Sequence, residues 1–327
     1  LDEDAIRGIH RIYIIGCGSA YHVGMAARYV FESLARLPVE VDVASEFRYR
    51  NPVLEPDSLA LVISQSGETA DTLAALRIAR EHGVPVLGLC NVVGSSIARE
   101  SSAVIYTQAG PEISVASTKA MCSQMLMLAL VALYWGGRQG IMDAAARARQ
   151  IALLESLPSQ LDAALPAMHE KARQLARAYA QARNFFYLGR GHCYPLALEG
   201  ALKLKELSYI HAEGYAAGEM KHGPIALLEP GFPVVAIVPA DRVHDKTVSN
   251  IQEVNARGAV CVAVAPDGDE SVASLCEHVL WIPPVADELL VPIVAVVHLQ
   301  ILARYVARTR GCDVDKPRNL AKSVTVE

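Results

Sequence analysis

The sequence predicts an α/β protein made of two tandem, doubly wound parallel-sheet domains, and three observations lead to this fold class. The chain has 327 residues, about twice the usual length of a single domain. Residues 14–21 resemble residues 187–194 at an offset of 173, and Thr72 aligns with Thr247 at an offset of 175. In both halves, short β-branched runs alternate with longer segments of helical periodicity. A duplicated strand–helix–strand domain accounts for all three observations.

Each expected element of the first copy has its own pattern. Apolar and β-branched runs predict strands at residues 12–15, 39–43, 59–63, 86–89 and 103–106. Apolar residues recur at helical spacing over residues 21–37 and 71–82, which predicts helices there. Repeated strand–helix–strand units give a parallel sheet with right-handed crossovers and helices on both faces.

The domain boundaries follow from the same patterns. We place the first domain at residues 1–145 and the second at residues 181–310. Residues 146–180 are rich in Ala, Arg and Gln without a strand pattern, so we expect helices that join the two copies. Residues 311–327 have no clear period and contain Pro317. On periodicity alone, this tail is a frayed terminus.

Composition and charge exclude several classes of protein. Thirty Lys and Arg against 35 Asp and Glu give a net charge of -5, so there is no basic excess for binding nucleic acid. The most apolar run, residues 125–135, is about half of the ~20 residues that a membrane span needs. The seven cysteines are scattered without a C-x-x-C pair, which argues against a disulfide framework and a zinc site. We expect a cytoplasmic protein that contacts neither nucleic acid nor a membrane.

The loop after the third predicted strand, residues 64–69, reads Ser-Gln-Ser-Gly-Glu-Thr and opens a helix. In doubly wound folds, ligands lie beyond the carboxyl ends of the strands. Three hydroxyls, a side-chain amide, a glycine and the N–H groups of a helix N-terminus form a candidate cradle for an anion such as phosphate. The alternative is that Ser66 or Thr69 is an ordinary helix N-cap.

Two other loops are weaker candidates for a ligand site. Gly16, Cys17 and Gly18 follow the first strand, but a dinucleotide fingerprint needs a glycine where this chain has Tyr21, so NAD is not expected. Residues 112–119 lead into an apolar helix. Their hydroxyls either cap that helix or border a polar ligand.

Groups suited to proton transfer lie in the second copy. Glu199, Lys203 and Glu206 are spaced i, i+4, i+7, so they share one helix face. One alternative is a solvent-exposed row of ion pairs. The other is a partly buried base with a shifted pKa, because the apolar neighbours leave only a narrow part of the helix surface facing solvent. His222 precedes a Gly-Pro turn, where a structural and a catalytic role are both open.

Four segments together resemble the isomerase half of the glucosamine-6-phosphate synthase (glutamine:fructose-6-phosphate amidotransferase) family. They are SQSGETADT at 64–72, VASTKA at 115–120, the run 198–224, and DVDKPRNLAKSVTVE at 313–327. The resemblance covers the whole chain. It implies two sugar isomerase (SIS) domains of flavodoxin- or Rossmann-like topology and an extended catalytic tail. It also implies that the glutaminase domain of full-length members is absent from this chain.

The resemblance assigns the phosphate side of a sugar-phosphate site. The residues that would hold the phosphate or lie near it are Ser64, Gln65, Ser66, Thr69, Cys17, Val115 and Ser117. Family members usually have a serine where this chain has Ala20, so one hydroxyl on the phosphate side is lost. Neither a metal ion nor an organic cofactor is implied.

The resemblance also assigns four catalytic residues. Lys322 would form a Schiff base with the open ketose, and His222 would assist ring opening. Glu206 would move a proton between C1 and C2, and Lys203 would lie beside the sugar oxygens. One base that serves two adjacent carbons is what an aldose–ketose shift requires.

The implied activity is the conversion of fructose 6-phosphate towards the aldose 6-phosphate, or to glucosamine 6-phosphate when ammonia is supplied. The family implies a homodimer in which the histidine loop comes from the neighbouring subunit. One alternative is a non-catalytic sugar-phosphate sensor, which would not need Glu206, His222 and Lys322. The other is an aminosugar-phosphate deaminase or deglycase, against which the pattern at 313–327 argues.

Overall fold

The computed structural model describes residues 3–325, which group into two compact units. The first unit comprises residues 3–152 together with 321–325, and the second comprises residues 153–320. The boundary between the units falls inside the segment expected to join the domains. The end of the tail belongs to the first unit, although it follows the second unit in the chain.

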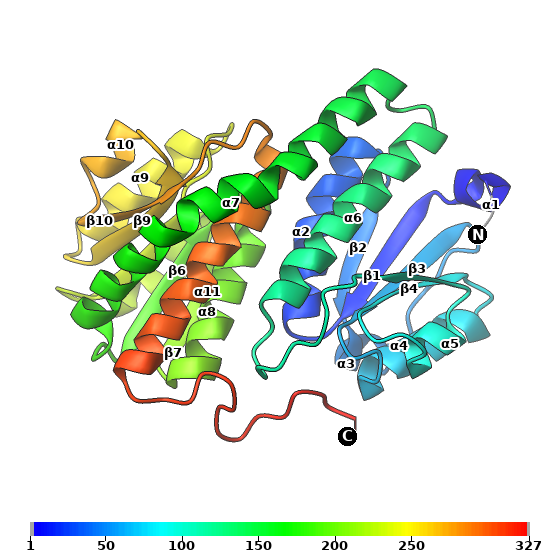
Figure 1. Ribbon diagram of the computed structural model, residues 1–327, viewed down its shortest axis with the longest axis horizontal. Helices are drawn as coiled ribbons and strands as arrows, with labels where there is room; N and C mark the ends of the chain where they lie inside the picture. Colours follow the sequence, from blue (N-terminus) through cyan, green and yellow to red (C-terminus); the bar gives the residue numbers. More distant parts are fainter. Residues whose placement is uncertain (1–2, 326–327) are drawn as a thin grey trace. The chain divides into compact units, whose positions relative to one another are not determined.

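The first unit is built on a five-stranded parallel sheet (Figure 1). Across the sheet, the strands are β2 (Val39–Val43), β1 (Arg11–Gly16), β3 (Ser58–Ser64), β4 (Val86–Cys90) and β5 (Ala103–Tyr106). Every residue of the central strand β3 is buried, as expected for a strand covered on both faces. The five predicted strands are confirmed.

Helices cover both faces of this sheet (Figure 1). They are α1 (Glu3–Gly8), α2 (Ser19–Leu34), α3 (Ala44–Phe47), α4 (Ala70–Glu81), α5 (Ser96–Glu100) and α6 (Lys119–Arg138). Helices α2 and α6 pack together on one face, while Phe47 of α3 and Leu76 of α4 enter the core on the other. Helix α2 ends before the predicted residue 37, because Arg36 takes a positive φ of 53° and Pro38 follows shortly after it.

The second unit repeats the same sheet. Its strands across the sheet are β7 (His211–Ala216), β6 (Asn184–Gly189), β8 (Pro233–Ile237), β9 (Val260–Pro266) and β10 (His278–Ile282). Strand β6 begins 173 residues after β1, and β8 begins 175 residues after β3. These are the offsets found in the sequence, so the duplicated doubly wound domain is confirmed.

The helices of the second unit also lie on both faces of its sheet (Figure 1). They are α8 (Tyr194–Ser208), α9 (His244–Asn255), α10 (Glu270–Ala273) and α11 (Val291–Thr309), with the 3-10 turns η1 (Gly191–Cys193), η2 (Ala217–His222), η3 (Pro224–Leu227) and η4 (Glu288–Leu290). Close packing of α8 requires Gly200, since a Cβ there would lie 2.7 Å from the ring of Tyr187. The joining segment is a single helix, α7 (Ala144–Tyr179), and not the several helices expected, although it contains Pro158 and Pro166.

Two helices are long and apolar enough to cross a membrane by length and composition alone. They are Lys119–Arg138, which is α6, and Glu288–Thr309, which includes α11. In their most apolar windows, 61% and 72% of the residues are buried inside the protein. Both are therefore core helices, and α6 packs chiefly on α2 while α11 packs chiefly on α8.

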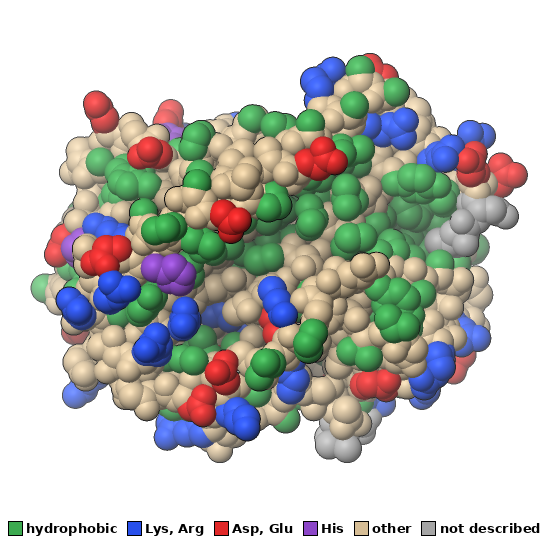
Figure 2. All heavy atoms as spheres, viewed as in Figure 1, with side chains coloured by type: hydrophobic (Ala, Val, Ile, Leu, Met, Phe, Trp, Pro, Cys, Tyr) green, Lys and Arg blue, Asp and Glu red, His purple; other side chains and the backbone are tan. Residues whose placement is uncertain are grey.

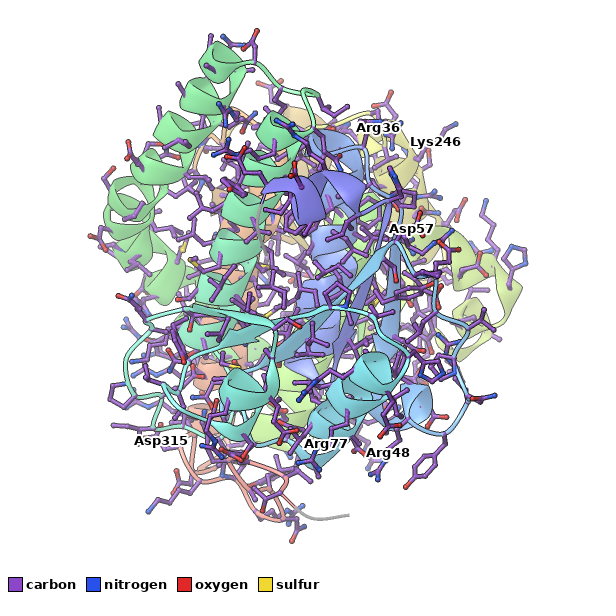
Figure 3. The ribbon with its side chains drawn as sticks, turned by 90° about the vertical axis from the view of Figure 1, so that its right-hand side faces the viewer. Arg36, Arg48, Asp57, Arg77, Lys246 and Asp315 are labelled. Carbon is purple, nitrogen blue, oxygen red and sulfur yellow. The ribbon has the colours of Figure 1, made fainter. Side chains whose placement is uncertain are left out.

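Hydrogen bonds hold the tail, so the expectation of a frayed terminus is wrong for its described residues. The Asp313 carboxylate accepts the N–H groups of Asp315 (labelled in Figure 3) and Lys316 at 2.9 and 3.0 Å. The hydroxyl of Tyr209 accepts the N–H of Arg318 at 2.8 Å, and the Arg318 guanidinium lies 4.2 Å from the centre of the Tyr209 ring. Residues without regular secondary structure are thus positioned by side chains.

Charged side chains of both signs are interspersed over the face drawn in Figure 2. In the first unit, Arg48 pairs with Asp71 at 3.0 Å, and Arg77 forms two 2.8 Å bonds with Glu100 (Arg48 and Arg77 are labelled in Figure 3). Such exposed pairs contribute at most about 1 kcal/mol each. The fold therefore depends on its two apolar cores rather than on surface charge.

We predict that His298 of α11 makes the stability of the second unit depend on pH. Its side chain is buried, and its Nε2–H donates to the carbonyl of Trp281 at 3.0 Å. Burial lowers the pKa of His298 from 6.5 to about 4. The unfolded chain then binds the proton more tightly, so the stabilisation is complete above about pH 6.5 and falls as the pH drops towards 4. At pH 5, the loss is about 2 kcal/mol.

Urea unfolding at pH 7 and pH 5 measures this loss. The variant His298→Gln keeps an amide donor for Trp281 but has no group that titrates there, so it should lose about 2 kcal/mol less than the native chain over this interval. Equal losses for the two proteins would contradict the assignment.

Candidate functional site

The strand order of the first unit brings two loops to one switch point. Strand β1 leads into α2 and β3 leads into α4, and these helices lie on opposite faces of the sheet although β1 and β3 are neighbours. In open α/β sheets, ligands bind where the connections diverge in this way. The predicted anion loop, residues 64–69, follows β3 at this point.

The hydroxyls of the anion loop face one another at the start of α4. Ser64 Oγ lies 3.0 Å from Thr69 Oγ1 and accepts the N–H of Gly67 at 3.0 Å. Ser66 Oγ accepts the N–H of Glu68 at 3.2 Å. Thr69 is the N-cap residue of α4, yet its side chain makes no capping hydrogen bond. The ordinary-cap interpretation is therefore wrong for Thr69, and its hydroxyl lies where helix N–H groups attract anions.

Gly67 is the residue that lets the loop close. Its φ is +68°, and a Cβ at this position would lie 2.0 Å from the Ser95 hydroxyl oxygen. Behind the loop, the Glu68 carboxylate accepts the N–H of Ser96 at 2.8 Å. The Ser96 hydroxyl and, to a smaller extent, this N–H lower the pKa of Glu68. The loop is thus tied to the N-terminus of α5 and admits no side chain at position 67.

The second predicted loop, residues 112–119, is organised by one nearly buried carboxylate. Glu112 accepts the Thr118 N–H at 2.7 Å, the Thr118 hydroxyl at 3.1 Å and the Ala120 N–H at 3.4 Å. The Ser117 hydroxyl donates to the same carboxylate at 3.4 Å. Glu112 therefore supplies the acceptor that the N-terminus of α6 needs.

The tail places an amine beside this carboxylate. Lys322 Nζ donates to the carbonyl of Ser114 at 2.6 Å and lies 3.4 Å from Glu112 Oε2. The Lys322 side chain is 29% exposed. The carbonyl and the carboxylate thus hold the amine in place, while part of the side chain stays open to solvent.

The residues that follow Lys322 bind the anion loop directly. The Ser323 hydroxyl lies 3.0 Å from Ser66 Oγ, and the carbonyl of Val324 accepts the N–H of Ala70 at 3.1 Å. The tail therefore brings the lysine, the anion loop and the Glu112 loop into one cluster within the first unit.

The remaining predicted binding residues of this unit are half-buried. Cys17 lies 3.9 Å from the Thr72 hydroxyl, and burial raises the pKa of its thiol, so it is a neutral group at pH 7. The Gln65 carbonyl accepts the N–H of Asn91 at 3.1 Å. Val115 lies within the Glu112 loop. These contacts position backbone and add no charge.

In the second unit, the carboxylates and lysine of α8 form a buried group. Lys203 Nζ lies 2.5 Å from Glu206 and 3.4 Å from Glu199, and the Lys203 and Glu199 side chains are 1% and 0% exposed. The solvated-stripe interpretation is therefore wrong. Burial by itself lowers the pKa of Lys203, but the two carboxylates outweigh it, and the pKa is raised. Glu206 is 21% exposed and is the member that solvent can reach.

His222 stands apart from this group. It is exposed at the end of η2, before Gly223 with its φ of 136°. Within residues 3–325, no hydrogen bond or ion pair of His222 is found. Its neighbour Lys221 pairs with Glu253 of α9 at 2.6 Å. The structure thus fixes the turn beside the histidine and leaves the ring accessible.

The second unit lacks a hydroxyl cradle at its own switch point. The loop after β8 carries Asp241, whose side chain is 3% exposed. Its carboxylate accepts the N–H of Val243 at 2.8 Å, directly before α9, and lies 3.9 Å from the His192 ring. A carboxylate of the chain itself occupies the position that an external anion would need.

Sequence reasoning did not single out two residues of this cluster, Glu112 and Ser323. The signal for Glu112 is an acidic residue six positions before the N-cap of an apolar helix, a variant of the reciprocal capping pattern. Ser323 has no signal beyond its place next to Lys322, because its partner Ser66 is 257 residues away.

The chain was compared with known proteins. A family model described as SIS domain matches residues 5–134 and 178–310. A glutamine–fructose-6-phosphate aminotransferase (isomerizing) of Clostridium tetani is 48% identical over 327 residues, which are 100% of this chain and 54% of that protein. The chain thus spans about half the length of the curated relatives it matches.

Two solved structures are also similar. The C-terminal domain of glucosamine-fructose-6-phosphate aminotransferase from Francisella tularensis has a TM-score of 0.92 and 39% identity, covering 96% of this chain and 89% of that one. A glucosamine-6-phosphate deaminase of Thermotoga maritima has a TM-score of 0.78 and 23% identity, covering 96% and 90%. At that identity, the second likeness concerns the fold alone.

We predict that Gly67→Ala removes anion binding by the first unit. The added methyl group would clash with Ser95 and distort the loop, so the affinity for inorganic phosphate should fall at least about tenfold, and stability should fall by about 2 kcal/mol or more. Calorimetry and thermal melting measure the two effects.

The matched control is Gly83→Ala. Gly83 also has a positive φ, of +74°, but a Cβ there meets nothing within 4 Å. It should cost about 1 kcal/mol of stability and leave phosphate affinity unchanged. Equal phosphate affinity for both variants would show that the loop is not an anion site.

Proposed function

This chain belongs to the SIS domain family, and from that membership we propose that it is the ketose–aldose isomerase part of a glutamine–fructose-6-phosphate aminotransferase. Its relatives of that name support the proposal over the whole length of the chain. The proposed substrate is fructose 6-phosphate, and the proposed product is the aldose 6-phosphate, or glucosamine 6-phosphate when ammonia is available.

One observation carries the proposal: the Lys322 amine lies in the same cluster as the anion loop. The hydroxyl of the adjoining residue, Ser323, is 3.0 Å from Ser66 of that loop. A phosphate held by the loop would fix one end of the sugar and place its carbonyl beside the Lys322 amine. The binding energy of the phosphate would thus be used to orient the two reacting groups.

The proposed reaction begins with the open-chain ketose. We assign ring opening to His222, which is exposed and which the neighbouring subunit would supply in the homodimer that the family resemblance implies. Lys322 adds to C2 and expels water: overall, its ammonium and the ketone give a protonated imine and one water, so that no further proton is needed. The carbonyl of Ser114, which accepts from Nζ at 2.6 Å, orients the amine for this step.

The proton transfer is assigned to Glu206. Without ammonia, water first hydrolyses the lysine imine, and the Glu206 carboxylate then moves a proton from C1 to C2 through an enediol while the O1 proton passes to O2, which gives the aldose. With ammonia, the nitrogen of ammonia first displaces Lys322 from C2, and Glu206 makes the same transfer on that imine. Lys203, held between Glu199 and Glu206, orients that carboxylate and offers a positive charge to the sugar oxygens. When ammonia replaces the lysine at the imine, the amine nitrogen remains on C2.

The assignment of Lys322 predicts a covalent adduct. With fructose 6-phosphate and borohydride, the imine should be reduced to a stable secondary amine on Lys322, and peptide mass mapping should locate it there. Lys322→Arg should give no adduct, because a guanidinium does not form the imine.

The matched control is Lys246→Arg, which changes an exposed lysine of α9 outside this cluster. It should label like the native chain. An adduct on Lys203 would reassign the imine to the second unit.

The assignment of Glu206 predicts a selective loss of turnover. Glu206→Gln should lower the rate of aldose 6-phosphate formation by about a hundredfold or more, since the amide is not a base. Binding of fructose 6-phosphate should change little, because the phosphate is assigned to the first unit. Coupled spectrophotometric assay and calorimetry measure the two quantities.

Glu229→Gln, at an exposed carboxylate of the same unit, is the control and should retain native turnover. If the native chain binds the sugar phosphate without converting it, the sensor function replaces the isomerase. If it releases ammonia from glucosamine 6-phosphate faster than it forms that compound, the deaminase function does.

A further inference from the structure

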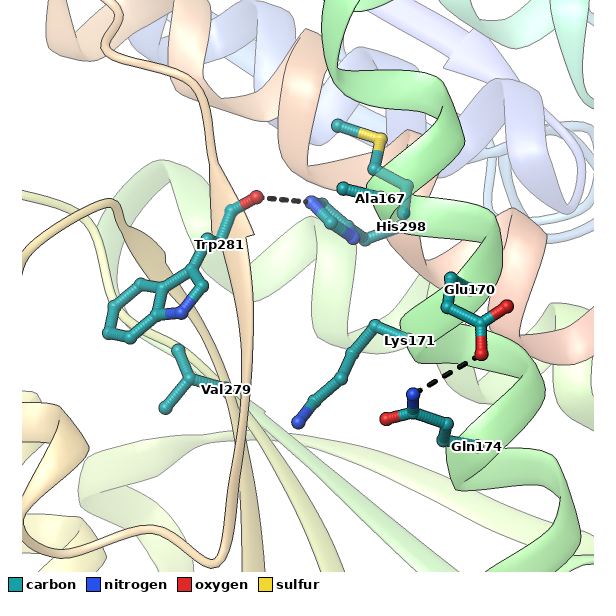
Figure 4. Close-up of a pocket in the computed structure, with 8 residues that line it drawn as sticks. Ala167, Glu170, Lys171, Gln174, Val279, Trp281 and His298 are labelled. Carbon is teal, nitrogen blue, oxygen red and sulfur yellow. Dashed lines mark hydrogen bonds between the residues drawn. The ribbon is translucent and has the colours of Figure 1, made fainter.

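A cavity of about 320 Å³ opens in the second unit between α7, β10 and α11 (Figure 4). None of the residues assigned a role in the proposed function lines it. Its volume lies at the lower end of the range for small-molecule sites. It therefore requires an explanation of its own.

The walls of the cavity combine apolar side chains, including an exposed indole, with polar side chains of α7 and α11. Met168 of α7 and Val279 of β10 are buried, while Trp281 of β10 is 37% exposed. Figure 4 shows the indole and Val279 on one side of the cavity and the side chains of α7 on the other. Strand β10 is an edge strand, so the protein leaves a large flat aromatic surface open to solvent beside a hollow.

The cavity has one positive charge without a partner. Lys171 of α7 extends towards it (Figure 4), and no ion pair of Lys171 is found within residues 3–325. The carboxylate of Glu170 also lines the cavity, but it is engaged by Arg173 and by Gln174, the latter at 3.3 Å (Figure 4). The charge of Lys171 nevertheless acts nearby: together with burial, it lowers the pKa of His278.

His298 adds no second charge. Its Nε2–H donates to the carbonyl of Trp281 at 3.0 Å, and burial keeps the ring neutral at pH 7 by lowering its pKa to about 4. The same hydrogen bond fixes the backbone that carries the indole. Among the described residues that line the cavity, Lys171 is thus the one cation.

We propose that this cavity binds a small, flat aromatic monocarboxylate. The ring system lies against Trp281, Val279 and Met168, where offset stacking and sulfur–aromatic contact favour a planar group. The carboxylate pairs with the ammonium of Lys171, which is half-buried beside the apolar side chains. A neutral ligand would leave the ammonium unpaired, and a dianion would carry a charge that the described lining does not match.

The test uses 2-naphthoate as the probe and 2-naphthylmethanol as its neutral counterpart, with isothermal calorimetry on the full chain. We expect saturable one-to-one binding of the carboxylate. Lys171→Met, which keeps the apolar stem, should weaken 2-naphthoate at least tenfold and leave the alcohol unchanged. Lys171→Arg should retain most of the affinity, and Trp281→Leu should weaken both probes.

The matched control is Lys246→Met, at an exposed lysine of α9 in the same unit (Figure 3). It should bind 2-naphthoate like the native chain. Equal affinity of the carboxylate and the alcohol, or an unchanged affinity in Lys171→Met, would overturn the proposal and leave only nonspecific adsorption. No saturable heat with the native chain would also overturn it. Fructose 6-phosphate binding should be the same in all four variants, so this test and the test of the isomerase fail independently.

Discussion

The parallel arrangement of the strands is the constraint on which the site depends. Within each sheet, every described strand pair is parallel, so all carboxyl ends meet at one edge. The order β2-β1-β3-β4-β5 then sends the connections after β1 and β3 to opposite faces, which leaves the loops between them free to hold a ligand. The anion loop lies there because a helix begins directly after it, and the unpaired N–H groups of that helix favour negative charge.

A second requirement is that the tail be held without secondary structure of its own. The carboxylate of Glu112 meets this need, because it accepts backbone and hydroxyl donors at the start of α6 and also faces Lys322. A nearly buried carboxylate is costly unless its oxygens are satisfied, and here several donors satisfy them. Ser323 and Val324 then fasten the chain to the anion loop. The Lys322 amine, to which the proposed function gives the covalent step, is thereby held from two sides.

The two copies of the domain have diverged in complementary ways. The first copy keeps hydroxyls at its switch point, while the second has the buried Asp241 carboxylate there. The second copy instead has Glu199 and Lys203 buried on α8, and the side chain of Glu206 beside them is partly exposed to solvent. Burying a lysine between two carboxylates is tolerated because each charge is paired. The first copy thus presents hydroxyls and helix N–H groups at its switch point, and the second presents a paired ion cluster on α8.

The sequence by itself determined the fold and the identity of most chemical groups. Strand patterns depend on the spacing of neighbouring residues, and the repeat of residues 14–21 at 187–194 shows that the same sheet occurs twice. The Ser-Gln-Ser-Gly-Glu-Thr loop predicted an anion site. Only the tertiary structure decided what these groups touch. The Thr69 hydroxyl makes no capping hydrogen bond with its helix. Glu199 and Lys203 of α8 are buried and do not face solvent. In the tail, Ser323 contacts Ser66, which is 257 residues away in the chain. Such contacts join residues far apart in the chain, and no local pattern of spacing records them.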